Sequence, residues 1–234
     1  MRLEEYLNTK NIFPAALLFL LTIISFNLFA VFDFASGYNY PILGFLSSSY
    51  FSYPFMFLIT LLFIKKFEKN KLKQLFSSLG YVKTNFVKSI KWALFFGLVY
   101  LVLILIFISI SGSDINKEFS KWYQTRFIRW YDPTFAFSVL FGAAFVEETA
   151  FRGYILTRLT PKGKLTLKKA ILPILIAGLF HMAWHWPFGF YEPSYWGLVN
   201  NIGSMLISIA TGFIMLKTRN IFGASLLHII SDFL

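Results

Sequence analysis

The sequence predicts an all-α integral membrane protein of about seven transmembrane helices with a polar cavity inside the membrane. Hydrophobic residues make up 57% of the 234 residues and charged residues 14%, whereas soluble domains carry about 25% charged residues. The mean hydropathy of +0.63 agrees with this assignment. These values exclude a soluble enzyme and a disordered chain, and the absence of cysteine excludes disulfides, thiolate metal sites and a cysteine nucleophile.

Seven apolar stretches account for the predicted spans, and most approach the roughly 20 residues needed to cross about 30 Å of hydrocarbon. They lie at 13–32, 42–64, 92–112, 134–156, 170–190, 198–216 and 221–234. We therefore divide the chain into an N-terminal region of three spans, residues 1–133, and a C-terminal core of four spans, residues 134–234.

The basic residues are distributed unevenly between the segments that connect these spans. Of the 22 Lys and Arg residues, 17 lie in alternate segments, namely 1–12, 65–91, 157–169 and 217–220. Cytoplasmic loops of membrane proteins carry such an excess, so we expect the N-terminus in the cytoplasm. Membrane topology then explains the net charge of +11, and no nucleic-acid partner is expected.

Two connecting segments, 65–91 and 115–131, mix polar residues with large apolar ones. Amphipathic segments of this kind lie in the membrane interface, so the plain interpretation is anchoring to membrane lipid. A second interpretation is a gate or recognition surface for a substrate embedded in the lipid.

Ionisable residues inside the predicted spans are the most informative feature of the sequence. A charged side chain at the centre of a bilayer costs about 3 kcal/mol, and all three histidines of the chain fall in apolar stretches. The candidate site residues are Glu147, Glu148, Arg152, His181, His185, His228 and Asp232.

Glu148 and Arg152 are four residues apart, so on a helix they share a face and can form an ion pair. This pair is either a structural clamp between helices or part of the chemistry. Glu147 points about 100° away from Glu148 on an α-helix and has no cation at helical spacing. A carboxylate without such a partner inside a span indicates a function.

The histidines show the same spacing of four residues. His181 and His185 share one helix face, as do His228 and Asp232, and a carboxylate in that position can fix the tautomer of an imidazole. The carboxylate of Glu147 with two or three inward histidines is a constellation for activating water or binding a metal.

Three motifs, in order, resemble those of the CPBP family, the CAAX proteases and bacteriocin-processing enzymes that are also called the Abi family. The run Glu147–Arg152 resembles the EExxxR motif. The second family motif is an aromatic residue four positions before a histidine; here His185 takes the histidine position, and His181 stands where Phe or Trp is usual. His228 and Asp232 match the third motif, a histidine followed four positions later by Asn or Asp.

The resemblance covers about residues 134–234 and implies an intramembrane endopeptidase in which a glutamate activates water. It implies a peptide or protein substrate at the membrane, such as a leader peptide or a lipidated C-terminus, and a location in the bacterial plasma membrane. A second role linked to the family is that of a non-proteolytic bacteriocin-immunity or scaffold protein. A proton-coupled transporter is a further alternative, since intramembrane acids and histidines also build proton relays.

By this resemblance Glu147 is the general base, and His185 and His228 hold the water or stabilise the oxyanion. An ionised Asp232 can only accept hydrogen bonds, so we expect it to orient His228. The supporting residues are Glu148, Arg152 and His181. We expect no cofactor, and the alternative is a zinc ion held by Glu147, His185 and His228, in a chain that has no HExxH motif.

Overall fold

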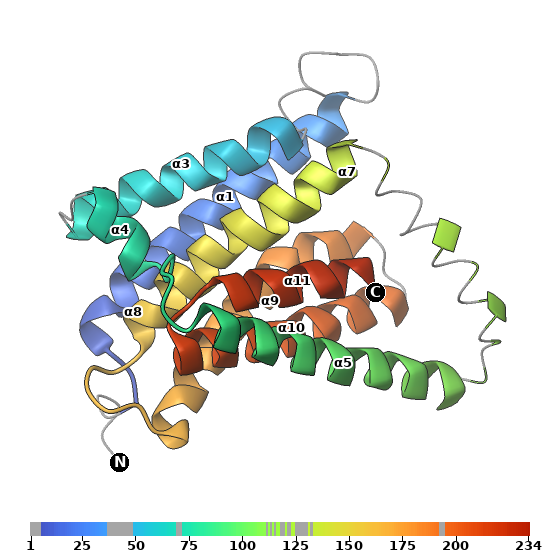
Figure 1. Cartoon of the computed structure of the whole chain (residues 1–234). Helices are drawn as coiled ribbons and strands as arrows, with labels where there is room; N and C mark the ends of the chain where they lie inside the picture. Colours follow the sequence, from blue (N-terminus) through green and yellow to red (C-terminus); the bar gives the residue numbers. More distant parts are fainter. Residues whose placement is uncertain are drawn as a thin grey trace.

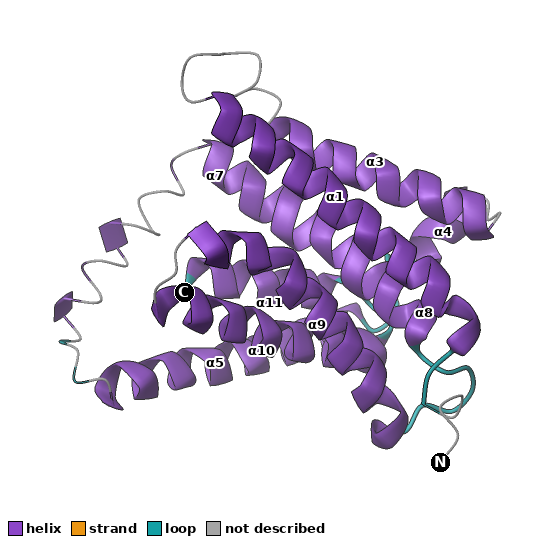
Figure 2. Ribbon diagram, turned by 180° about the vertical axis from the view of Figure 1, so that it is seen from behind, coloured by secondary structure: helices purple, strands orange, loops and turns teal. Residues whose placement is uncertain are grey.

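The computed structural model describes residues 6–36, 49–68, 72–110, 133–191 and 195–234, and single positions between 111 and 132. Every regular element in those ranges is a helix (Figures 1 and 2), which confirms the all-α prediction. The predicted spans correspond to α1 (Ile12–Ser36), α3 (Ser49–Glu68), α5 (Phe86–Ile110), a composite fourth helix, α9 (Leu167–Tyr191), α10 (Tyr195–Thr218) and α11 (Phe222–Phe233).

Two of these helices meet, by length and composition, the requirements for crossing a membrane. They cover Phe86–Ile110 and Leu167–Trp184. Among the described residues, the apolar parts of three further helices are shorter, at Thr9–Ile24, Ile202–Thr218 and Phe222–Phe233. The helices therefore lie where the sequence predicts them, while the number of membrane crossings stays a prediction.

The predicted amphipathic segments are described unequally. Segment 65–91 contains the end of α3, the short helix α4 (Leu72–Ser78), a loop and the start of α5. Leu75 and Leu79 in this segment are buried against the rest of the chain. Most of segment 115–131 lies outside the described residues, and the location of both segments in the membrane interface stays a prediction.

The fourth helix is composite, and most of it is π-helical. It consists of α7 (Pro133–Phe137), η5 (Ser138–Glu147), η6 (Thr149–Leu156) and α8 (Thr157–Leu159). A π-helix has i→i+5 hydrogen bonds, is rare, and occurs frequently at functional sites. The periodicity of an α-helix therefore does not hold here, and the structure has to supply the directions of the side chains around Glu147.

The helices form two layers, and the fourth helix contacts both of them (Figure 1). On one side α1 packs on α3, and α3 packs on η5. On the other side α10 packs on α9 and α11, and α5 packs on α11. Because α11 also contacts η5, and α9 and α10 contact η6, the side chains of the EExxxR run reach helices of both layers.

The start of α11 is held against α5 by a buried asparagine and a glycine. The side chain of Asn220 accepts a hydrogen bond from Ser89 Oγ (3.0 Å) and donates one to the Val82 carbonyl (2.6 Å). A Cβ atom at Gly223 would lie 2.4 Å from the Ser89 carbonyl oxygen, so only glycine allows this close approach of the two helices. These contacts set the position of α11 and, two turns along it, of His228.

Candidate active site

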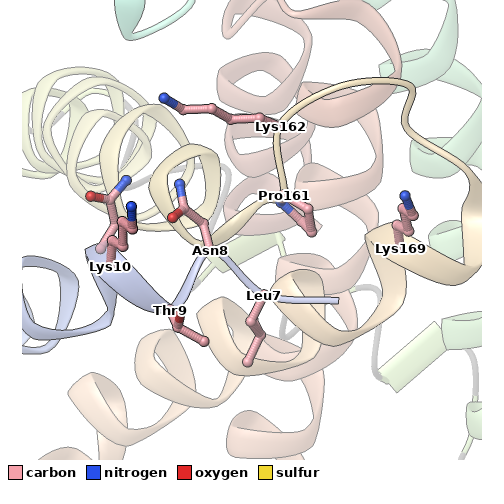
Figure 3. A pocket seen from close by; sticks show the side chains of 8 residues that line it. Leu7, Asn8, Thr9, Lys10, Pro161, Lys162 and Lys169 are labelled. Atoms are coloured by element: carbon pink, nitrogen blue, oxygen red, sulfur yellow. The ribbon is translucent and has the colours of Figure 1, made fainter. Parts of the chain in front are cut away.

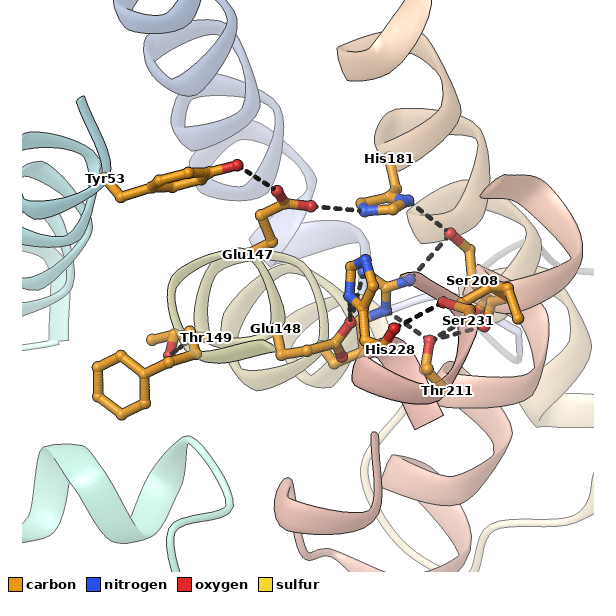
Figure 4. Close-up of polar contacts among 12 residues, drawn as sticks. Tyr53, Glu147, Glu148, Thr149, His181, Ser208, Thr211, His228 and Ser231 are labelled. Atoms are coloured by element: carbon orange, nitrogen blue, oxygen red, sulfur yellow. Dashed lines mark hydrogen bonds and ion pairs between the residues drawn. The ribbon is translucent and has the colours of Figure 1, made fainter. Parts of the chain in front are cut away.

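Glu147 ends η5 and lies between α3 and α9, with a partner on each (Figure 4). Its Oε2 is 3.0 Å from His181 Nε2 on α9, and its Oε1 accepts a hydrogen bond of 3.3 Å from the hydroxyl of Tyr53 on α3. Glu147 and His181 are only 2% and 1% exposed. The carboxylate that lacks a partner in its own helix is therefore held by side chains from two other helices.

The contact from Tyr53 depends on a glycine one turn before Glu147. The ring of Tyr53 lies directly over Gly142, where an added Cβ would be 2.2 Å from Cε2 and 2.3 Å from Cζ. Carbon atoms in favourable contact are about 3.5–4.0 Å apart. Any side chain at position 142 would therefore displace the ring that carries the hydroxyl to Glu147.

A chain of polar side chains orients His181 through Nδ1, the ring nitrogen that does not face Glu147. Arg152 Nη2 donates to Ser208 Oγ (2.9 Å) on α10, and this oxygen lies 2.8 Å from His181 Nδ1. Arg152 Nε donates to Thr211 Oγ1 (2.9 Å), one turn further along α10. Because Ser208 already accepts from Arg152, its own proton can go to Nδ1, which leaves Nε2–H of His181 to donate to the Glu147 carboxylate.

Glu148 holds a second set of partners. Its Oε1 is 3.2 Å from Arg152 Nη1, the i,i+4 ion pair expected from the sequence, although the angles are not those of a hydrogen bond. The same oxygen is 2.8 Å from His228 Nδ1. Glu148 is fully buried, so one carboxylate both compensates the guanidinium and orients His228 through Nδ1, a pairing not predicted from the sequence.

The structure places the remaining predicted residues as follows. Asp232 lies one turn after His228 on α11. Its predicted role in orienting His228 stays a prediction. His185 lies in α9, but its side chain is outside the described residues, so its catalytic role also stays a prediction. Among the described residues of α9, His181 is the histidine that contacts Glu147. The sequence motif places His181 in a supporting position.

Three donor atoms in this cluster are arranged so that they could hold a metal ion. Glu147, His181 and His228 each offer one ligand atom, and these atoms lie within 4.8 Å of one another. One carboxylate and two imidazoles are the donor set of many catalytic zinc sites, where the ion lowers the pKa of a bound water. The donors therefore fit zinc by type, with His181 in the place that the sequence analysis gives to His185.

The loop before α5 is tied to the same part of the fourth helix. Tyr81 Oη lies 2.5 Å from Thr149 Oγ1, which in turn donates to the Phe145 carbonyl (2.5 Å). Burial raises the pKa of the Tyr81 hydroxyl well above its ordinary value, so this hydroxyl stays protonated and donates to Thr149. The contact fixes the helix directly beside Glu147 and Glu148.

The sequence analysis did not identify three residues of the site, Tyr53, Ser208 and Thr211. Ser208 and Thr211 are polar residues three positions apart in an apolar span, a spacing that puts both on one helix face and could have drawn attention to them. Tyr53 has no such signal, because tyrosines are common in this chain and its contact depends on Gly142 in another helix.

Residues 129–234 match the model of the Rce1-like family, described as type II CAAX prenyl endopeptidase Rce1-like. This part of the chain is similar to that family, and we call it the Rce1-like region. The match confirms the resemblance to CAAX proteases that the three motifs indicate, and all the histidines and acidic residues of the candidate site lie within the Rce1-like region. Tyr53 lies outside it.

The other comparisons add no relative, since neither a curated protein nor a solved structure matches this chain. The Rce1-like match, together with the two long apolar helices, indicates a membrane protein.

Proposed function

We propose that the protein is an intramembrane endopeptidase that hydrolyses a peptide bond with a water activated by Glu147. The observation that carries this proposal is the buried contact between Glu147 Oε2 and His181 Nε2, with the His228 ring centre 5.6 Å from that of His181. A carboxylate and two imidazoles from three helices meet here within an Rce1-like region. The match gives no support to the immunity or transporter alternatives.

In the proposed reaction, Glu147 takes a proton from a water molecule as its oxygen attacks the carbonyl carbon of the scissile bond. The negative charge that develops on the carbonyl oxygen is stabilised by His228 in its imidazolium form, which donates from Nδ1 to Glu148 and from Nε2 to the oxyanion. The protonated Glu147 then gives its proton to the amide nitrogen as the C–N bond breaks. His181 keeps Glu147 in position throughout.

Access of water and substrate is part of the proposal. Glu147, His181 and His228 are 2%, 1% and 4% exposed, so the predicted polar cavity is a closed polar cluster in this structure. Hydrolysis then requires the two layers of helices to separate locally around η5 when substrate binds. Such gating is common in enzymes that sequester their chemistry.

For the substrate we propose a peptide at the membrane surface with a lipidated C-terminus, because the family description names a CAAX prenyl endopeptidase; a leader peptide is the other class. We further propose that the protein resides in the bacterial plasma membrane with its N-terminus in the cytoplasm. A reporter fused after residue 163 should then report the cytoplasm, and one fused near residue 192 the opposite side.

The decisive experiment replaces Glu147 by Gln, which keeps the size of the side chain but cannot accept the proton of water. Cleavage of a fluorogenic farnesylated CAAX peptide by the purified protein should fall by about 10²–10⁴-fold. The matched control is Glu68→Gln, because Glu68 pairs with Arg158 at the end of α3 that is remote from Tyr53. Wild-type cleavage by the Glu147 variant would refute the proposed base.

A further inference from the structure

A pocket with a basic lining lies away from the candidate active site, where the N-terminal segment meets the loop between α8 and α9 (Figure 3). Its volume is about 430 Å³, which is in the range of small-molecule sites, roughly 300–1,000 Å³. The polar part of its lining comes from Asn8, Thr9, Lys10, Asn11, Lys162 and Lys169.

The three lysines have no negative partner in the part of the chain that the structure describes. No carboxylate there lines the pocket, and none of the ion pairs there involves Lys10, Lys162 or Lys169. Arg158, close by in sequence, is in contrast neutralised by Glu68. The three lysines stand at different points of the rim of the pocket (Figure 3), and together they give it a positive potential that favours a bound anion.

The walls of the pocket are joined by hydrogen bonds. The backbone N–H of Asn8 donates to the Leu159 carbonyl (2.9 Å), and Asn11 Nδ2 donates to the Arg158 carbonyl (3.3 Å). Leu7 is 4% exposed and forms part of the main hydrophobic cluster. The lysines therefore stand on two segments that are already fixed to each other, which lowers the entropic cost of binding a ligand.

Apolar side chains that face outward adjoin the pocket on both segments. Phe13, three residues after Lys10, is 70% exposed; Leu167 and Ile171, on either side of Lys169, are 67% and 48% exposed. The pocket thus lies at the boundary between the polar loops and an apolar outer surface. In a bilayer this is the depth of the lipid phosphates, and the distribution of cations predicts that this face is cytoplasmic.

We propose that this pocket binds the phosphate-bearing headgroup of an anionic phospholipid of the cytoplasmic leaflet. Lys10, Lys162 and Lys169 attract the phosphate from different points of the rim, Asn8 and Asn11 contact the polar remainder of the headgroup, and the acyl chains lie along the outer faces of α1 and α9. Basic pockets between helices on the cytoplasmic side are known to bind such headgroups. The proposal is independent of peptidase activity.

The test measures binding of dihexanoyl phosphatidylglycerol below its micellar concentration to the purified full-length protein in neutral detergent. Dihexanoyl phosphatidylcholine, with the same acyl chains and no net charge, and inorganic phosphate are the comparison ligands. We expect tight binding of phosphatidylglycerol only. The triple variant Lys10→Gln, Lys162→Gln, Lys169→Gln should weaken it by about 100-fold, since each lysine near an anionic lipid contributes about fivefold.

The matched control is the triple variant Lys83→Gln, Lys88→Gln, Lys91→Gln, which removes the same charge from exposed lysines on the same predicted face and should bind as wild type. Equal loss in both triple variants would show an effect of bulk charge and overturn the proposal. So would equal binding of the two lipids, or equal binding of inorganic phosphate, which would indicate a soluble ligand. If the pocket variant fails to fold, the three single variants are used, and wild-type binding by all three would overturn it.

Discussion

Replacing Gly142 by Ala tests the placement of Tyr53 over η5. The added Cβ would lie 2.2–2.5 Å from Cε2, Cζ and Cδ2 of the Tyr53 ring, whereas favourable carbon contacts are about 3.5 Å or longer. The ring therefore has to move by about 1.3 Å or more. The hydroxyl already lies 3.3 Å from Glu147 Oε1, so this movement breaks the hydrogen bond.

Two effects of Gly142→Ala follow, one on stability and one on cleavage. Overpacking a tight contact costs about 1–3 kcal/mol, which corresponds to a fall in Tm of roughly 2–12 °C for a chain of this size. Because Glu147 loses one of the partners that position it, the substitution should lower kcat by about 10–100-fold, with little change in KM. Tyr53→Phe removes the hydroxyl and keeps the ring, so it should reproduce the loss in kcat without the steric cost.

A double-mutant cycle decides whether the ring is the cause. Thermal unfolding in detergent is measured for the wild type, Gly142→Ala, Tyr53→Ala and the double variant. Without the ring, alanine at position 142 should cost nothing, or should stabilise the helix by about 0.5–1 kcal/mol. If Gly142→Ala lowers Tm equally with and without the Tyr53 ring, the reasoning is refuted.

Three further predictions concern the polar cluster. Glu148→Gln should leave Arg152, which is 2% exposed, buried without its counter-charge at a cost of about 3–5 kcal/mol; an unchanged Tm would contradict this. His181→Ala should abolish cleavage because it removes the partner of Glu147 Oε2, and wild-type cleavage by this variant would contradict the role of His181. If the site works without metal, cleavage should survive strong chelation and elemental analysis should find less than one zinc per chain. Stoichiometric zinc that is lost in His228→Ala would favour the zinc site instead.

The positions of the helices could be predicted because hydrophobicity is a local property of the chain. The stretch 92–112 was expected as a span, and α5 covers Phe86–Ile110. The limits of that approach appear in the fourth helix, where an apolar run indicates a helix but does not distinguish i→i+4 from i→i+5 hydrogen bonds. The π-helices η5 and η6 pack against helices of both layers, and they were not predicted from the sequence.

Within the site, contacts inside one helix were predictable and contacts between helices were not. The ion pair of Glu148 with Arg152 follows from their spacing and is present at 3.2 Å. The contact of Glu148 with His228, 80 residues away, does not follow from any spacing. The same is true of Tyr53 and Glu147, which are 94 residues apart.

The two histidines of α9 illustrate the reason most clearly. Spacing predicts that His181 and His185 share one helix face, but it does not decide which of them lies at the height of Glu147, and the structure shows the contact of His181. That choice depends on how far α9 is shifted along its axis relative to η5, and a shift of one helical turn, about 5.4 Å, exchanges the two positions. The spacing of residues along a chain specifies which side chains share a face, but the height at which two helices pack is set by the side chains of all the helices around them.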